Sequence, residues 1–121
     1  MSKTILIVDD SASMRQVVSM ALKGNAYDVI EACDGKDALA KLSGQKVHLV
    51  ISDVNMPNMD GITFVREMKK IAAYKFVAVV MLTTEGSDEK KKAGQDAGAK
   101  AWVVKPFQPQ QMLAVVAKLL M

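Results

Sequence analysis

The sequence has little of what builds disulfide frameworks, membrane spans or nucleic-acid platforms. Cys33 is the single cysteine among 121 residues, so an internal disulfide is excluded and a reducing compartment is favoured. Three Phe, two Tyr and one Trp with a net charge of +3 do not make the basic, aromatic surface of a nucleic-acid reader. The longest apolar run, residues 76–82, is too short to cross a bilayer, and Asp9 makes the amino terminus acidic too early for a signal peptide. We therefore expect a cytoplasmic protein that binds neither nucleic acid nor membrane.

The composition that remains is that of a soluble globular protein. Apolar residues make up 50% of the chain and charged residues 24%. A chain of this length is enough for one domain with a real core and too short for two. We expect residues 1–121 to form one domain without linker, repeat or low-complexity segment, and to be a monomer.

Short apolar segments alternate along the chain with segments of helical spacing. The predicted strands cover residues 4–8, 28–32, 49–52, 76–82 and 101–104. The predicted helices begin near Ser11, Asp34, Gly61, Ser87 and Pro109. The third helix is expected to bury Ile62, Val65, Met68 and Ile71 or Ala72. Strand–helix–strand units are parallel and right-handed by default, so the pattern predicts one doubly wound α/β domain.

Polar residues follow four of the five predicted strands. Asp9 and Asp10 come after the first strand, Asp53 after the third, Thr83 after the fourth and Lys105 after the fifth. Parallel strands place their carboxyl ends at one edge of the sheet, so these side chains are expected to meet there. Carboxylates about 4 Å apart repel by roughly 4 kcal/mol per pair at an effective dielectric of about 20, so the cluster needs a cation or a proton. Oxygen-only ligands suit Mg²⁺, and one carboxylate can then act as a nucleophile in phosphoryl transfer.

Four motifs spread over the chain are similar to those of a known family. They are Val8-Asp9-Asp10-Ser11, the stretch from Ser52 to Gly61, Leu82-Thr83-Thr84-Glu85, and Lys105-Pro106-Phe107. On these motifs the sequence resembles a response-regulator receiver domain, and within that family the stand-alone chemotaxis regulators of the CheY type. The resemblance implies a flavodoxin-like (βα)5 fold with a five-stranded parallel sheet of order 2-1-3-4-5.

The resemblance also assigns the phosphorylation chemistry. Asp53 would accept a phosphoryl group from the phosphohistidine of a CheA-like histidine kinase. Asp9, Asp10, Asp53 and the backbone carbonyl of Asn55 would hold Mg²⁺. Lys105 would contact the phosphoryl oxygens. A protein of this kind assists its own phosphorylation and acyl-phosphate hydrolysis but does not turn over external substrates.

Further positions match the parts of the family that transmit and time the signal. Thr83 and Trp102 match the two switch residues, and Asn55 and Glu85 match positions that tune hydrolysis of the acyl phosphate. The best-known flagellar-motor members have tyrosine where this chain has Trp102, and an indole lacks the hydroxyl group of tyrosine. Both a flagellar motor switch partner and a phosphate-sink role therefore stay open.

Three other classes of protein compete with the receiver hypothesis. A Mg²⁺-dependent phosphatase of the haloacid-dehalogenase type also uses an aspartate nucleophile, but it needs an Asp-x-Asp pair where this chain has Asp53-x-Asn55. A flavodoxin-like cofactor binder needs hydroxyls and glycine after its first strand, where Asp9 and Asp10 would repel phosphate. A pure interaction module would have no reason to keep all the site residues.

Overall fold

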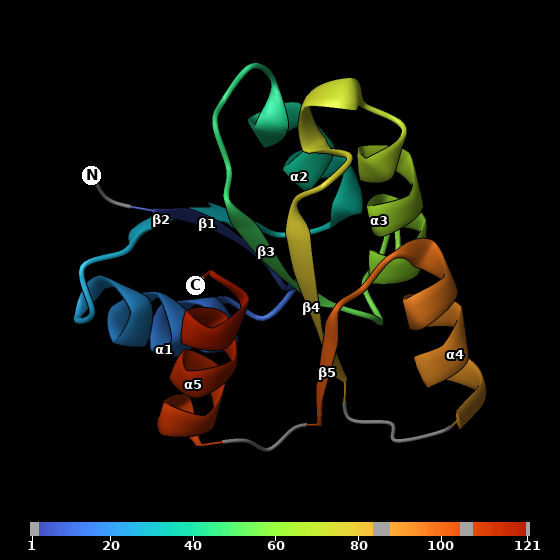
Figure 1. The fold of residues 1–121 in the computed structure, drawn as a ribbon. Helices are drawn as coiled ribbons and strands as arrows, with labels where there is room; N and C mark the ends of the chain where they lie inside the picture. The colour runs from blue at the N-terminus through green and yellow to red at the C-terminus, as the bar shows by residue number, and fades with distance from the viewer. Residues whose placement is uncertain (1–2, 84–87, 105–107, 121) are drawn as a thin grey trace.

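The computed structural model describes residues 3–83, 88–104 and 108–120, with the backbone alone at 88–91 and 94. Strands and helices alternate along it, and one short 3₁₀ helix, η1, lies between the third helix and the fourth strand (Figure 1). The strands are β1 (Thr4–Val8), β2 (Asp28–Ala32), β3 (Leu49–Asp53), β4 (Ala78–Thr83) and β5 (Ala101–Val104). The helices are α1 (Ala12–Lys23), α2 (Gly35–Leu42), α3 (Gly61–Lys69), η1 (Ala72–Tyr74), α4 (Asp88–Ala97) and α5 (Pro109–Leu119).

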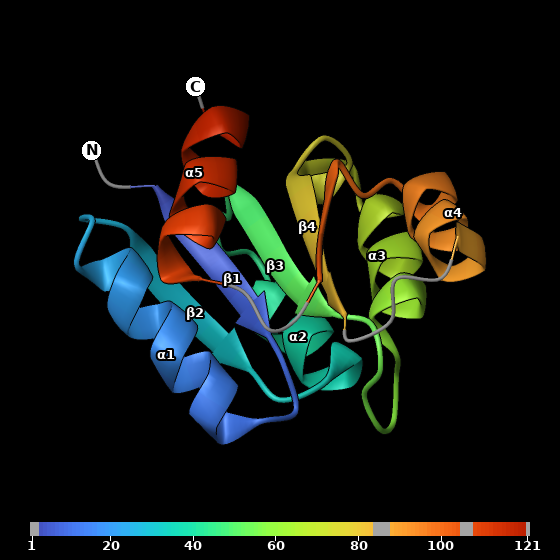
Figure 2. The ribbon, with the colours of Figure 1, turned by 90° about the horizontal axis from the view of Figure 1, so that it is seen from below.

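The strands form one parallel sheet in the order β2-β1-β3-β4-β5, which confirms the predicted fold. Helices α1 and α5 lie on one face of the sheet, and α2, α3 and α4 lie on the other (Figure 2). The central strands β1, β3 and β4 are hydrophobic on both faces because both faces are covered. All strands run the same way, so their carboxyl ends share one edge of the sheet, the carboxyl edge. Their amino ends share the opposite edge, the amino edge.

Alternate residues of each central strand belong to two separate hydrophobic clusters, one on each face of the sheet. Along β1, Ile5 and Ile7 pack with α1 and α5 residues such as Leu22 and Met112. The intervening Leu6 and Val8 pack on the other face with residues of α2 and α3. This alternation follows from the two-residue period of a strand, and it fixes the register of the sheet.

Side-chain caps begin three helices at the carboxyl edge. Ser11, Asp34 and Asp60 each accept a hydrogen bond from the backbone N–H three residues ahead, which fixes where α1, α2 and α3 start. Pro109 is the first residue of α5, as predicted, where a missing N–H costs nothing. The predicted Ser87 cap of α4 lies outside the described residues.

The prediction was wrong at the start of the fourth strand and at the end of the third helix. Phe76, expected in the strand, is 89% exposed, and β4 begins at Ala78. Helix α3 ends at Lys69, so the side chain of Ile71 is 41% exposed rather than buried, and Ala72 begins η1. The apolar run in the sequence continues through a turn that the hydrophobic pattern does not mark.

Candidate functional site

The acidic residues at the carboxyl edge come together as predicted. Asp9, Asp10 and Asp53 each present one carboxylate oxygen, and these three atoms lie within 4.8 Å of one another. Asp9 and Asp53 are buried, whereas Asp10 is exposed. Thr83 ends β4 beside them and is fully buried. We refer to Asp9, Asp10 and Asp53 as the acidic cluster.

Asp53 is held by close backbone packing at the end of β3. The Ser52 hydroxyl donates to the Asp53 carbonyl oxygen over 2.9 Å. A Cβ atom on Gly61 would lie 1.9 Å from that same oxygen, so only glycine fits at the start of α3. The Val54 N–H donates to the Leu82 carbonyl at 3.0 Å, which keeps the chain beside β4 after the strand ends. The position of Asp53 is thus determined by backbone contacts around it.

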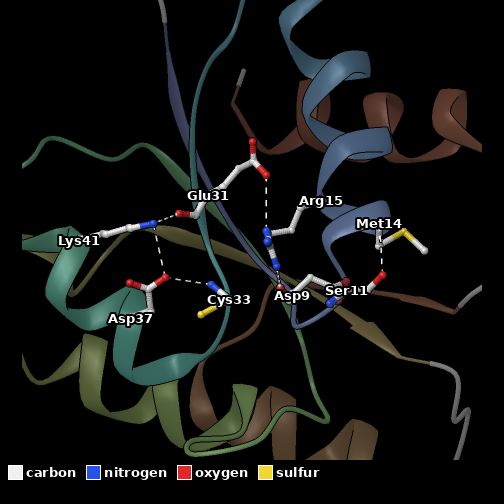
Figure 3. Close-up of polar contacts among 8 residues, drawn as sticks. All are labelled: Asp9, Ser11, Met14, Arg15, Glu31, Cys33, Asp37 and Lys41. Atoms are coloured by element: carbon white, nitrogen blue, oxygen red, sulfur yellow. Dashed lines mark hydrogen bonds and ion pairs between the residues drawn. The ribbon is translucent and has the colours of Figure 1, made fainter.

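Asp9 is held from two sides (Figure 3). Its Oδ1 accepts the Ser11 N–H at 2.9 Å, and its carbonyl oxygen accepts Arg15 Nη1 at 2.6 Å. The Nε of Arg15 lies 3.5 Å from Glu31 Oε1, so the guanidinium also ties α1 to β2. Arg15 therefore fixes the backbone of Asp9 just after the end of β1.

The donor set of the acidic cluster fits a hard divalent cation. It consists of carboxylate oxygens, which Mg²⁺ and Ca²⁺ prefer, and it contains no thiolate or imidazole. Three like charges this close are mutually repulsive, at roughly 4 kcal/mol per pair for a 4 Å separation, until a cation or proton compensates them. The resemblance to receiver domains implies Mg²⁺ in an acidic pocket of this kind.

Two of the predicted site residues lie outside the described part of the chain, and Asn55 lies in the loop after β3. Asn55 is exposed and lines a recess of about 370 Å³ with Asp60, Thr63 and Arg66, next to Val54. Lys105 and Glu85 lie outside the described residues, as does Thr84.

Trp102 lies in β5 and packs against the hydrophobic cluster on the α2–α3–α4 face. Its Nε1 is buried and has no hydrogen-bond partner within the described part of the chain. It also lines a recess of about 180 Å³ with Gln95, Ala99, Lys100 and Ala101. The ring is therefore partly buried next to α4.

Sequence reasoning missed two contacts near the site, those of Arg15 with Asp9 and of Asn58 with Asp34. Arg15, which contacts the Asp9 carbonyl, looked like one more polar residue on a helix. Asn58 donates to Asp34 across 24 positions of the chain at 2.8 Å. The available signals were the cap residue Asp34 and an asparagine in a turn, and neither indicates its partner.

Solved structures share this architecture over almost the whole chain. The chemotaxis protein CheY4 of Vibrio cholerae is 44% identical with a TM-score of 0.95, covering 98% of this chain and 99% of that one. The BeF₃-activated DrrB receiver domain is 32% identical with a TM-score of 0.90, covering 99% and 98%. The sheet order and the acidic cluster thus define a CheY-like doubly wound protein.

The chain belongs to the response regulator receiver domain family, which matches residues 5–117. It is accordingly a signalling domain of a two-component response regulator. Among curated relatives, the phosphate regulon transcriptional regulatory protein PhoB of Pseudomonas aeruginosa is 34% identical over 112 residues, covering 93% of this chain and 49% of the relative. The chain spans about half the length of the curated relatives it matches. In the described residues, no helix is both long and apolar enough to span a membrane.

Proposed function

We propose that Asp53 is the phosphoacceptor of this receiver domain. The observation that carries the proposal is the meeting of Asp53 with Asp9 and Asp10 within 4.8 Å at the carboxyl edge of a receiver fold. Asp9, Asp10, Asp53 and the backbone carbonyl of Asn55 would hold Mg²⁺, which supplies positive charge to the phosphoryl oxygens.

The donor is a phosphohistidine of a histidine kinase. A carboxylate oxygen of Asp53 attacks phosphorus, so that the new P–O bond forms as the P–N bond breaks. The electron pair of the broken bond stays on the imidazole, and no other reactant is consumed. Gly61 and Ser52 hold the backbone of Asp53 in place for this attack. Lys105 would contact the phosphoryl oxygens, and Asn55 and Glu85 would set the lifetime of the acyl phosphate.

The output is a change in the surface rather than turnover of a substrate. Thr83, buried at the end of β4, would hydrogen-bond to the phosphoryl group, and Trp102 would follow it as the second switch residue. The Nε1 of Trp102 has no partner among the described residues, and this supports the role because a shift of the ring can bring it one.

A role in bacterial chemotaxis is the finer proposal. It is supported by 44% identity to a chemotaxis protein, against 34% to a transcriptional regulator of phosphate metabolism. We propose a CheA-like kinase as donor, a cytoplasmic location and a monomeric state. The target is a flagellar motor switch component, and the second candidate is a phosphate sink that has no motor target.

Incubation with acetyl phosphate and Mg²⁺, followed by mass spectrometry, tests the phosphoacceptor. We expect one added phosphoryl group in the wild type and none in Asp53→Asn, with both proteins folded by circular dichroism. The same mass gain in Asp53→Asn would refute the assignment. Sustained release of phosphate from a monoester such as p-nitrophenyl phosphate would indicate a dehalogenase-type phosphatase instead.

The fluorescence of Trp102 tests the switch. We expect Mg²⁺ alone to change the emission little, beryllofluoride with Mg²⁺ to shift or quench it, and Thr83→Ala to weaken that response. An emission spectrum that beryllofluoride leaves unchanged would show that Trp102 takes no part in the switch. Retention of a purified motor switch component by the beryllofluoride form, but not by Asp53→Asn, separates the motor role from the phosphate sink.

A further inference from the structure

The loop between β3 and α3, residues 54–60, carries Asn55 and is closed at its base by backbone bonds. Val54 donates its N–H to the Leu82 carbonyl at 3.0 Å, and Gly61 donates to the Val54 carbonyl at 2.9 Å. Both bonds hold the base of the loop, where it leaves β3 and enters α3. The tip, which includes Asn58 and Met59, is positioned by contacts from elsewhere in the fold.

Those contacts come from the turn between β2 and α2. Asn58 Nδ2 donates to Asp34 Oδ2 at 2.8 Å, and the Gly35 N–H donates to the Met59 carbonyl at 3.2 Å. A Cβ atom on Gly35 would lie 2.7 Å from Met59 Cγ, so the two loops touch backbone to side chain with no room between them. We call Asp34, Gly35, Asn58 and Met59 the loop clasp.

Asp34 is a well-anchored acceptor in the loop clasp. Its side chain is buried, and its Oδ1 accepts the Asp37 N–H at 2.8 Å as the cap of α2. The Asp37 N–H, and after it the Asn58 amide, hold the pKa of Asp34 below its ordinary value. The bond to Asn58 is therefore charge-assisted and starts from a carboxylate that the helix already fixes.

Asn58 itself is suited to the tip of the loop by its backbone. Its φ is 66°, in the left-handed region that asparagine tolerates better than most residues. The side chain can then reach back to Asp34 while the chain turns toward α3. Asn58 thus shapes the tip of the loop in two ways, through its backbone conformation and through its side-chain amide.

The elements on either side of this turn, β2 and α2, are also linked to Asp9 of the acidic cluster (Figure 3). Arg15 bonds the Asp9 carbonyl at 2.6 Å and pairs with Glu31 at 3.5 Å. Lys41 bonds the Glu31 carbonyl at 2.5 Å and pairs with Asp37 at 3.4 Å. This chain of contacts leads from Asp9 to the helix that Asp34 caps. Strand β2, helix α2 and the turn between them thus contact both Asp9, through Arg15, and the loop that carries Asn55.

We infer that Asn58 is a positioning residue for the divalent-cation site. Its bond to Asp34 holds the loop that carries Asn55 at a fixed distance from the carboxylates of Asp9, Asp10 and Asp53. The inference rests on the proposed function for the identity of the cation, Mg²⁺. Asn58 acts through the loop and touches neither the phosphoryl group nor the acidic cluster. Its loss therefore weakens cation binding without removing any group that reacts.

Isothermal titration calorimetry of the unphosphorylated protein with Mg²⁺ measures the effect. We expect the Asn58→Ala variant to bind Mg²⁺ about tenfold more weakly, as is typical when a residue that supports metal ligands is lost. At saturating Mg²⁺, its rate of phosphorylation by acetyl phosphate should stay within about twofold of the wild type, since no reacting group has changed. Asn25→Ala, which removes an amide that bonds the Ala21 carbonyl at 3.0 Å in α1, should leave both quantities unchanged.

Two further variants separate the side-chain bond from the backbone conformation. Asn58→Gly accepts the positive φ but lacks the amide, so it should bind Mg²⁺ as weakly as Asn58→Ala. The double variant Asp34→Asn/Asn58→Asp exchanges donor and acceptor, keeps the net charge, and should return to within about twofold of wild-type affinity. Circular dichroism confirms that each variant is folded.

Several outcomes would overturn the inference. These are wild-type affinity in Asn58→Ala, recovery of affinity by Asn58→Gly alone, or a wild type that binds no Mg²⁺. Failure of the wild type to take up a phosphoryl group, by contrast, would refute the proposed function, while the calorimetric comparison would still decide the role of the loop clasp.

Discussion

The two edges of the sheet differ in how closely they bring like charges together. At the carboxyl edge, Asp9, Asp10 and Asp53 bring like charges within 4.8 Å. At the amino edge, side chains bond backbone carbonyls: the Tyr74 hydroxyl donates to the carbonyls of Leu42 and Gln45, the latter at 2.7 Å. Lys69 donates from Nζ to the Val77 carbonyl, also at this edge.

On the proposed function, this domain divides stability and function between its two edges. Burial, and after it the nearby Lys100, lowers the pKa of Lys69, yet its ammonium has a carbonyl acceptor that keeps it in place. The acidic cluster is placed against its own repulsion, as is common where a site must bind a cation and react. Substitutions at the amino edge should therefore change stability alone, and substitutions at the carboxyl edge should change binding as well.

The largest effect is expected where backbone packing supports Asp53. Gly61→Ala places a Cβ atom against the Asp53 carbonyl, so the free energy of unfolding should fall by about 3 kcal/mol, the upper end for overpacking. Phosphorylation by acetyl phosphate should be lost with it. Urea denaturation and mass spectrometry measure the two effects. Gly44→Ala at the amino edge has open space but φ +76°, so it should cost about 1 kcal/mol and leave phosphorylation intact.

Substitution of Tyr74 is expected to lower stability without changing Mg²⁺ binding or phosphorylation. Tyr74→Phe leaves the carbonyls of Leu42 and Gln45 without their hydroxyl donor, which should lower the free energy of unfolding by about 2 kcal/mol. Mg²⁺ affinity and phosphorylation should match the wild type, and Tyr27→Phe serves as the control. Weakened Mg²⁺ binding in Tyr74→Phe would show that the two edges are coupled and that the division between them is wrong.

A gain of stability is expected when the acidic cluster loses one charge. Asp10→Asn removes repulsion, so without metal the free energy of unfolding should rise by about 1 kcal/mol. Millimolar Mg²⁺ should raise the melting temperature of the wild type but not of the variant. Asp28→Asn, at the exposed start of β2, is the matched control. A melting temperature that falls in Asp10→Asn would mean that the carboxylate supports the fold rather than the site.

The smallest effect concerns the acid sensitivity of the loop clasp. The pKa of Asp34 is lowered in the folded state, so its contribution to stability is complete above the ordinary value of 3.8. That contribution is lost as the pH falls through the lower folded-state pKa. Asp34→Asn should therefore show a shallower loss of unfolding free energy below about pH 4 than the wild type does. Urea titrations at a series of pH values test this, and identical slopes would contradict it.

The acidic cluster could be predicted from the sequence because polar residues follow four of the five predicted strands, whereas the sheet order came from the resemblance to receiver domains. Asp9, Asp53 and Thr83 follow apolar segments directly, and parallel strands leave their ends no other place to meet. Hydrophobic spacing likewise located Val65 and Met68 in the core. It overlooked Phe64, which is fully buried beside Val65 on a wider apolar face than the prediction allowed.

The remaining features depend on contacts between residues distant in sequence. Phe76 belongs to an unbroken apolar run, but η1 turns the chain so that its ring is exposed, with Lys75 Nζ 5.7 Å from the ring centroid. The bond between Asp34 and Asn58 joins two turns whose composition is ordinary for turns. No periodicity or spacing encodes such a pairing, which arises only when the fold places the two loops together.

The strand order has a consequence for self-association. Strands β2 and β5 are the two borders of the sheet, and each has one side without a hydrogen-bonded neighbour strand. An open border can recruit a second chain by edge-to-edge pairing, the first step toward aggregation. Here β2 carries Asp28 and Glu31, and β5 is only four residues long. Charged side chains on β2 and the short length of β5 both disfavour pairing with a second chain. We therefore expect the domain not to aggregate through the edges of its sheet.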